Sequence, residues 1–232
     1  MHRIDLTPVY VLHTRPYSNT SLIVEFFSQH YGRISAVARS ARGPQSRYKG
    51  QLQLFTPMLA SWSGHHELKM LGNIELNGLP HQLNQKPLFC GFYLNELLIR
   101  LLHRDDPHLN LFDYYAKSLC SLERNENISL ILRLFEKKLL EELGYGLSLT
   151  QEAKTRLPIV AENFYRYEHH QGFLLCDSKA HSVFSGGDLI AIAQEKFDTD
   201  AILQIAKRLM RLALTHLLGN KPLNSREFFS SI

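Results

Sequence analysis

Hydrophobic and polar residues alternate along the first third of the chain with the short period of β-strands. Three runs are rich in β-branched and aromatic residues and are bounded by Pro, Asn, Ser or Gly; they are Val9–Leu12, Leu22–Phe27 and Ile34–Ala38. Two further runs cover residues 52–62 and 67–76. Short strands in this order, without convincing helices between most of them, predict a small closed sheet rather than a βαβ fold.

Beyond Pro80 the hydrophobic period changes to that of helices. Predicted helices span about 87–103, 109–122, 128–143 and 201–218, and another begins at Gly186-Gly187-Asp188. Residues 157–184 return to a strand-like pattern. We therefore expect an α+β protein with a β-domain at 1–80, a boundary near 77–84, and a mainly helical domain at 81–232 that contains a small inserted β element at about 150–185.

The composition is that of an ordinary globular protein, with 44% hydrophobic and 21% charged residues. No apolar run is long enough for a signal peptide or a membrane span. Cys90, Cys120 and Cys176 are too far apart for a disulfide framework or a CxxC pair. We expect a cytoplasmic protein. The motifs of nucleotide-binding, zinc protease and serine hydrolase sites are missing, which favours a protein that is not an enzyme.

Basic residues are concentrated in two segments, although the net charge is only +4. Residues 26–66 and residues 201–226 each contain five Lys or Arg and no Asp or Glu. Acidic residues gather between these segments, for example at Asp105-Asp106 and Glu141-Glu142. This distribution predicts surfaces that face a polyanion rather than a generally basic protein.

The loop from Arg39 to Gly50 is the first candidate nucleic-acid contact. Its cations neutralise phosphates, its Ser and Gly residues allow close approach of a phosphate backbone, and its tyrosine can stack on a base. The candidate residues, including one from the preceding strand, are Arg33, Arg39, Arg42, Arg47, Tyr48 and Lys49. The alternative is a solvated loop whose charges only maintain solubility; the lack of acids favours binding.

The last predicted helix is the second candidate. Lys207, Arg208 and Arg211 share one helix face, opposite the apolar stripe that contains Ile202 and Leu209. A polar outward face is common to amphipathic helices, so this pattern also fits a helix without any ligand. The purely cationic character of the face supports a role in binding.

The helix at 128–143 carries cations beside a dense apolar set. Arg133, Lys137 and Lys138 have the spacing for ion pairs with Glu136, Glu141 or Glu142. The alternative is an apolar groove with a basic rim that binds an acidic, aromatic-containing peptide. The residues alone favour the ion pairs.

A metal site is the last possibility, because His169, His170, Cys176 and His181 lie close together. Structural zinc usually takes two close ligand pairs joined by a loop. The two histidines are adjacent and no cysteine pair exists, so the spacing argues against a metal.

Several short motifs, in collinear order over nearly the whole chain, resemble the bacterial RecO family of recombination mediators. They are Val11–Ser18 with Thr20–Leu22, Tyr31–Arg33, Ala38–Gly43, Lys49–Phe55, Tyr93–Leu98, Leu132–Glu136 with Leu143–Gly146, and Leu218–Glu227. Each motif is weak by itself, but their joint order is specific.

The resemblance implies an N-terminal five-stranded OB-fold barrel and a helical domain with a small zinc-ribbon-like insertion. It implies binding of single- and double-stranded DNA, strand annealing, and partnership with RecR and with the C-terminal tail of the single-strand-binding protein. In that setting the Arg39–Lys49 loop contacts DNA, and Arg133 holds the acidic tail. The proposed peptide pocket consists of Phe112, Arg133, Leu134, Lys137 and Leu139.

The sequence departs from this family pattern in two places. Thr150–Ala153 stand where the first pair of zinc cysteines would begin, and Cys176 is alone, so we predict no zinc and no other cofactor. The family's Leu-Lys-Ser-Arg near the end is Leu223-Asn224-Ser225-Arg226, which has one cation fewer.

The resulting hypothesis is a nucleoid-associated DNA-binding mediator of recombinational repair that performs no covalent chemistry. An RNA-binding OB-fold protein is one rival. A scaffold whose basic patches meet acidic protein partners is another.

Overall fold

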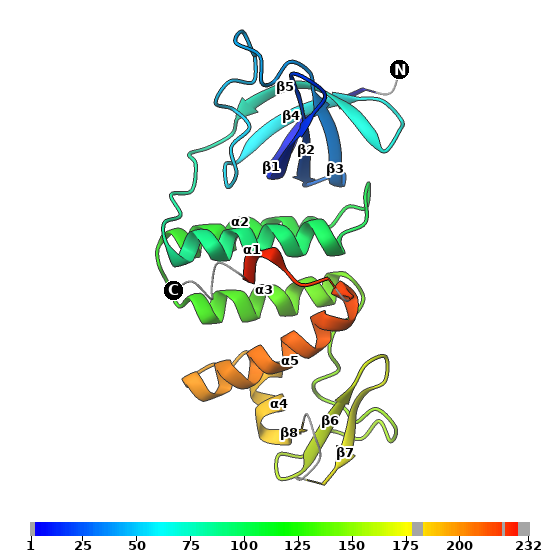
Figure 1. Ribbon diagram of the computed structural model, residues 1–232. Coiled ribbons are helices and arrows are strands. Elements are labelled where there is room, and N and C mark those ends of the chain that lie inside the picture. Colours follow the sequence, from blue (N-terminus) through cyan, green and yellow to red (C-terminus); the bar gives the residue numbers. More distant parts are fainter. Residues whose placement is uncertain (1–2, 178–182, 220, 227–232) are drawn as a thin grey trace. The chain divides into compact units, whose positions relative to one another are not determined.

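The computed structural model, drawn in Figure 1, describes residues 3–177, 183–219 and 221–226. It divides into two compact units. The first unit comprises Met1–Glu126 and Pro222–Ile232, and the second comprises Asn127–Lys221. The predicted boundary near 77–84 marks a change of secondary structure along the chain. The spatial division of the chain lies further on, because the first two helices pack with the barrel.

A closed barrel of five strands forms the N-terminal part of the first unit, in the order β1-β2-β3-β5-β4. The strands are β1 (Arg3–Tyr17), β2 (Ser21–Ser28), β3 (Gly32–Ala38), β4 (Met58–Ser63) and β5 (Leu68–Leu76). β3 and β5 pair in parallel, and β1 closes the barrel by antiparallel pairing with β4. The predicted OB-fold is confirmed.

One predicted strand is shorter than expected. Residues 52–62 were assigned to a single strand, but β4 begins only at Met58. The preceding segment touches the barrel through an isolated bridge between Leu54 and Val11. Phe55 has a left-handed φ of 58°, and its ring lies 5.6 Å from that of Phe92. Leu52 and Leu54 pack against the barrel core, so the apolar pattern of this segment reflects packing on the barrel and on α1 and not a continuous strand.

Strand β2 is buried on both of its faces. Val24 and Phe26 lie in the barrel core, whereas Phe27 projects to the opposite side. There its ring contacts Phe112 and Tyr115 at centroid distances of 5.4 and 6.1 Å. These two residues belong to helix α2 (Leu109–Glu123), which packs with α1 (Lys86–Leu101). Helices therefore cover the outer side of the barrel sheet around Phe27.

A buried hydrogen-bond chain fixes the helices to the barrel. The amide Nδ2 of Asn95 in α1 donates to the Leu12 carbonyl at 2.9 Å, and its Oδ1 accepts from the Tyr115 hydroxyl at 2.5 Å. Burial raises the pKa of Tyr115 well above its usual value, so the hydroxyl keeps its proton. The chain satisfies polar groups that would otherwise be unpaired in an apolar contact.

The C-terminal segment returns to the first unit and lies against α1. The Glu96 carboxylate accepts hydrogen bonds from the backbone N–H groups of Asn224 and Ser225, at 2.9 and 2.8 Å. Arg100 donates to the Pro222 carbonyl at 2.9 Å, and Leu223 is buried. The short 3-10 helix η1 (Asn224–Arg226) begins at this contact. The family-like motif at the chain end thus has a structural role.

The second unit combines three helices with a small sheet. Its helices are α3 (Ile128–Glu142), α4 (Gly186–Ala193) and α5 (Asp200–Leu218), and α3 packs against α5. Its sheet has the order β7-β6-β8, with β6 (Phe164–Glu168), β7 (Gly172–Cys176) and β8 (Val183–Ser185). The predicted inserted β element is present. Among the described residues, no helix is long and apolar enough to cross a membrane.

Replacing Gly32 in the β2–β3 turn with Ala is expected to destabilise the first unit strongly. Gly32 has a φ of +65°, and an added Cβ would lie 1.9 Å from the Asp106 carbonyl oxygen. Gly50 is a matched control, because its φ is +74° and a Cβ there meets no atom within 4 Å. Gly50→Ala should lower the free energy of unfolding by about 1–2 kcal/mol through backbone strain alone. Gly32→Ala should lower it by about 1–3 kcal/mol more, because the added Cβ overlaps the Asp106 backbone. Urea unfolding measures both; equal losses would contradict the steric argument.

Candidate nucleic-acid interface

The Arg39–Gly50 loop presents two cations that are free to meet a ligand. Arg39 and Lys49 are exposed, and neither side chain has a partner within the described part of the chain. Arg42 is also exposed but is already engaged. Its guanidinium donates to the carbonyls of Ser18 and Asn19 in the β1–β2 turn, at 2.8 and 2.7 Å. Arg42 therefore holds the loop against the turn.

Tyr48 does not stack on a base in this fold, contrary to the sequence-based expectation. The residue is only 3% exposed and belongs to the barrel core. Its hydroxyl donates to the Leu71 carbonyl at 2.9 Å and accepts from the guanidinium of Arg47 at 2.6 Å. The Arg47 guanidinium lies 4.8 Å from the Tyr48 ring centroid. A buried ring cannot meet a nucleobase, so this pair anchors the loop.

Arg33 is likewise committed to the interior, which corrects its assignment as a DNA contact. Its side chain is 16% exposed and pairs with the buried Glu25 at 3.3 Å. Its Nε donates to the Leu102 carbonyl at 3.0 Å. Burial lowers the pKa of the Arg33 guanidinium, and the Glu25 carboxylate opposes that shift. Arg33 therefore joins β3 to the end of α1.

Helix α5 of the second unit carries another cationic face. Lys207, Arg208 and Arg211 are exposed, whereas Leu209 and Met210 are buried. Arg208 donates to the Val183 carbonyl, and its guanidinium lies 4.4 Å from the Phe184 ring centroid. Lys207 and Arg211 have no side-chain partner among the described residues and lie one helical turn apart. Binding of nucleic acid at this face stays a prediction.

Arg133 and Lys138 of α3 form ion pairs as the residues alone indicated, whereas Lys137 pairs with a residue outside the helix. Arg133 and Glu136 are 2.7 Å apart, with side chains 7% and 3% exposed. Lys137 pairs with Glu195 at 2.7 Å, and Lys138 lies 3.4 Å from Glu142. The Nε–H of Arg133 has no acceptor among the described residues. A peptide carboxylate would therefore have to compete with Glu136 for this guanidinium.

Two residues of the proposed peptide pocket are core side chains. Leu139 is fully buried. Phe112 is 7% exposed, and its ring lies 5.5 Å from that of Tyr10 in the first unit. Both positions are occupied by packing contacts, so neither side chain is open to a peptide. Leu134 is partly exposed; its role and those of Arg133 and Lys137 stay predictions.

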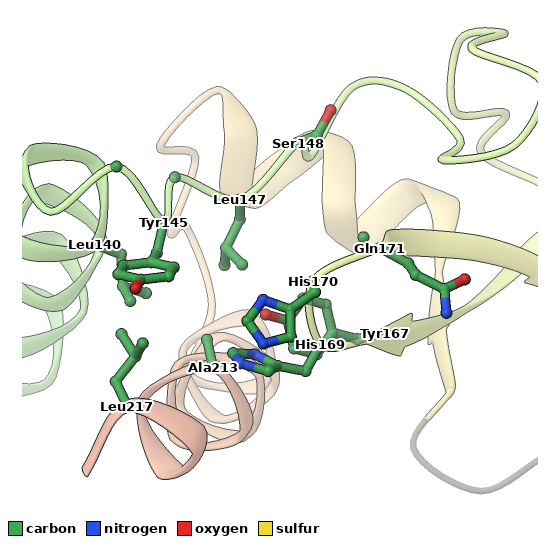
Figure 2. Close-up of a pocket in the computed structure, with 13 residues that line it drawn as sticks. Leu140, Tyr145, Leu147, Ser148, Tyr167, His169, His170, Gln171, Ala213 and Leu217 are labelled. Carbon is green, nitrogen blue, oxygen red and sulfur yellow. The ribbon is translucent and has the colours of Figure 1, made fainter.

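A cavity of about 320 Å³ lies between the ends of α3 and α5 and the β6–β7 turn (Figure 2). His169 stacks on His216 of α5 at a centroid distance of 4.1 Å and contacts His170 at 3.9 Å. Burial lowers the pKa of His169, and the neighbouring His216 and His170 lower it further. Tyr145 and Tyr167 also line this space. The lowered pKa favours the neutral form of the His169 imidazole.

No group of three His, Cys, Asp or Glu side chains that could hold a metal is found within the described residues. His169 contacts His170 and His216, and His181 lies outside the described part. The absence of zinc stays a prediction.

Glu152 organises the segment where zinc cysteines would begin in the resembling family. Its carboxylate accepts from the backbone N–H groups of Lys154 and Thr155, at 2.9 and 2.5 Å, and from the Thr155 hydroxyl at 2.7 Å. These hydrogen bonds, those from Thr155 most of all, lower the pKa of Glu152 to about 2. The Ala153 N–H also donates to the Phe173 carbonyl at 2.8 Å. Hydrogen bonds thus hold this turn against β7.

Comparison with known proteins gives a consistent result. The family model described as "Recombination protein O N terminal" matches residues 1–79, and "Recombination protein O C terminal" matches residues 86–227. The chain is 53% identical over 226 residues to a protein of Coxiella burnetii named DNA repair protein RecO, covering 97% of each chain. A protein of the same name from Haemophilus influenzae is 42% identical over 226 residues, covering 97% of this chain and 96% of that protein.

Breaking the buried Arg133–Glu136 pair is expected to destabilise the second unit. Arg133→Met leaves the Glu136 carboxylate buried without its cation and should cost about 3–5 kcal/mol of unfolding free energy. The double variant Arg133→Met/Glu136→Leu should recover most of this loss, because apolar residues of similar volume replace the pair. Denaturant unfolding of both variants measures the recovery. A double variant as unstable as the single one would contradict the ion-pair account.

Acidification should remove the stabilisation that Glu152 provides. Because its folded pKa of about 2 lies below the ordinary value of 4.5, its contribution is complete above pH ~4.5 and declines as the pH falls toward ~2. Glu152→Gln should therefore lower stability at neutral pH, and its difference from the parent chain should shrink in acid. Urea unfolding between pH 7 and pH 3 measures this difference, with exposed Glu162→Gln as control. If the difference in unfolding free energy between Glu152→Gln and the parent chain did not change with pH, the ionised carboxylate would not be the source of the stabilisation.

Proposed function

The chain belongs to the RecO family of DNA repair proteins, and on this premise we propose that it is a DNA-binding recombination mediator. It binds single- and double-stranded DNA, anneals complementary strands, and helps RecR to load the recombinase on DNA coated by single-strand-binding protein. It works at the nucleoid and by binding alone, without covalent chemistry.

The observation that carries this proposal is an exposed cationic surface on each unit, within a segment that has no acidic residues. In the first unit Arg39 and Lys49 are exposed and have no side-chain partner among the described residues, and in the second Lys207 and Arg211 share this property. Such cations bind phosphates and release condensed counterions. Phosphate contacts carry no base information, so binding would tolerate many sequences.

Annealing follows from the same electrostatics. Two complementary strands repel each other through their phosphates, and a protein that neutralises some of those charges lowers the repulsion. With cations on both units, one chain has groups for more than one strand. Binding through the phosphates also leaves the base edges free to pair.

The partner proposal rests on family membership and on α3. An acidic peptide tail would find its cation in Arg133, with Lys137 one helical turn away. Both are ion-paired, to Glu136 and Glu195, so the tail must displace at least one carboxylate. The RecR interaction rests on the family alone.

Removing free cations should flatten the salt dependence of DNA binding. For the double variant Arg39→Ala/Lys49→Ala we expect weaker binding of fluorescent single-stranded DNA. The slope of log K against log [salt] should fall by roughly 0.7 for each phosphate that the variant no longer neutralises. Stability should hardly change, because neither side chain has a partner among the described residues. The measurement is fluorescence anisotropy at several salt concentrations.

Gln45→Ala in the same loop is the matched neutral control, since Gln45 is exposed and uncharged. An unchanged slope in the double variant would remove the loop from the interface. Failure of the parent chain to bind DNA at low salt would contradict the proposal as a whole. Stronger binding of an RNA of matched sequence would favour the RNA-binding rival, and retained partner binding without DNA binding would favour a scaffold.

A further inference from the structure

The β1–β2 hairpin has an end that its covering helices leave exposed. Ile23 on the outer side of β2 is 5% exposed, and Leu12 of β1 is hydrogen-bonded to α1 through Asn95. Further along the hairpin, residues Arg15, Pro16 and Tyr17 are all exposed. The hairpin end is thus a part of the barrel sheet that remains open to a ligand.

Strand register places a tyrosine and an arginine on the outer side of this hairpin end, and a second arginine follows the neighbouring strand. Arg15 pairs with Ile23 and Tyr17 with Ser21, so these residues share one face of the sheet. On the next strand Leu22 pairs with Ala38, and both face the core. Ser21 precedes Leu22 on β2 and therefore projects to the opposite, outer side. Arg39 directly follows Ala38 in the turn after β3 and is exposed. Tyr17 thus lies beside the small Ser21, and Arg39 follows the residue that pairs with Leu22.

Tyr17 is the exposed aromatic residue of the described barrel strands. Its side chain is 45% exposed, whereas Tyr10 and Tyr48 are 5% and 3% exposed. An exposed ring at this position gains nothing from packing in the core. Neither Arg15, on the same face of β1, nor Arg39 has a side-chain partner among the described residues.

The hairpin end is held in place before any ligand arrives. Arg42 bonds to the carbonyls of Ser18 and Asn19, and its backbone N–H donates to the Thr20 carbonyl at 2.7 Å. These bonds join the turn that follows Tyr17 to the loop that carries Arg39. A platform fixed in this way loses little conformational entropy on binding.

We propose that Tyr17 is a stacking platform for one unpaired base of single-stranded nucleic acid, with Arg15 and Arg39 binding the phosphates on either side. This inference rests on the proposed function and deepens it. Inside a duplex both faces of each base are covered by stacking on its neighbours, so the site favours single strands over blunt duplexes. Residues 6–24 contain no Asp or Glu, so the charge of the hairpin around the ring suits a phosphate chain.

The test uses the full chain, fluorescent oligo(dT) and a blunt duplex. Tyr17→Ala should weaken oligo(dT) binding by ~5- to 150-fold, the range expected for one stacked base, and leave duplex binding nearly unchanged. The salt slope should stay that of the parent chain, because no charge is removed. Arg15→Ala should instead lower the slope. Tyr17→Phe should retain binding, since the ring remains.

Leu76→Ala is the matched control, because Leu76 is 64% exposed on another strand of the barrel, and it should not affect oligo(dT) binding. Tyr17→Trp adds a direct readout. The fluorescence of the introduced tryptophan, measured as the excess over that of the buried Trp62, should be quenched by oligo(dT). Thermal unfolding of Tyr17→Ala should match the parent chain.

Unchanged oligo(dT) binding by Tyr17→Ala, or equal losses for single strand and duplex, would overturn the stacking site. The stacking site would also be overturned if Tyr17→Ala lost binding to a protein partner while its DNA binding stayed intact. In each of these results the parent chain still binds DNA with a salt-dependent affinity, and the proposed function stands. Absence of DNA binding by the parent chain would instead remove the proposed function itself.

Discussion

Burial of the outer side of the barrel is the constraint on which the first unit depends. Phe27 and Tyr10 project away from the barrel core and would be exposed in an isolated barrel; α2 covers them with Phe112 and Tyr115. Asn95 of α1 makes this apolar contact specific. Its amide bonds to both Leu12 of β1 and Tyr115 of α2 only when the two helices and the strand are correctly aligned. The helices are therefore part of the folding unit of the barrel.

This constraint also decides where a ligand can bind. With the middle of the sheet covered, a phosphate chain has access to the hairpin end and the Arg39–Gly50 loop. The cations divide accordingly into two groups. Arg33, Arg42 and Arg47 hold backbone carbonyls or buried partners, whereas Arg39 and Lys49 remain free of partners within the described structure. Two of the loop's four cations, Arg42 and Arg47, thus hold the loop in place.

The second unit uses its charges in the same way. Arg208 attaches α5 to β8, and Arg133 is neutralised within α3, which leaves Lys207 and Arg211 exposed. Beside its small sheet, the Glu152 carboxylate binds the N–H groups of one turn. Hydrogen bonds that favour the charged form explain its low pKa. A carboxylate surrounded by such donors orders a turn locally, without requiring a large apolar core.

Local patterns in the sequence determined most of the elements, because strand alternation and helical periodicity act over a few residues. They also located both acid-free basic segments and, through collinear motifs, the family. Only the tertiary structure decided which side chains contact one another. Nothing near Tyr48 in the sequence shows that its ring enters the barrel core, or that Arg33 meets Leu102. Tyr17 was overlooked for the same reason: exposure is set by long-range packing, since a side chain is buried by whatever distant segment folds over it.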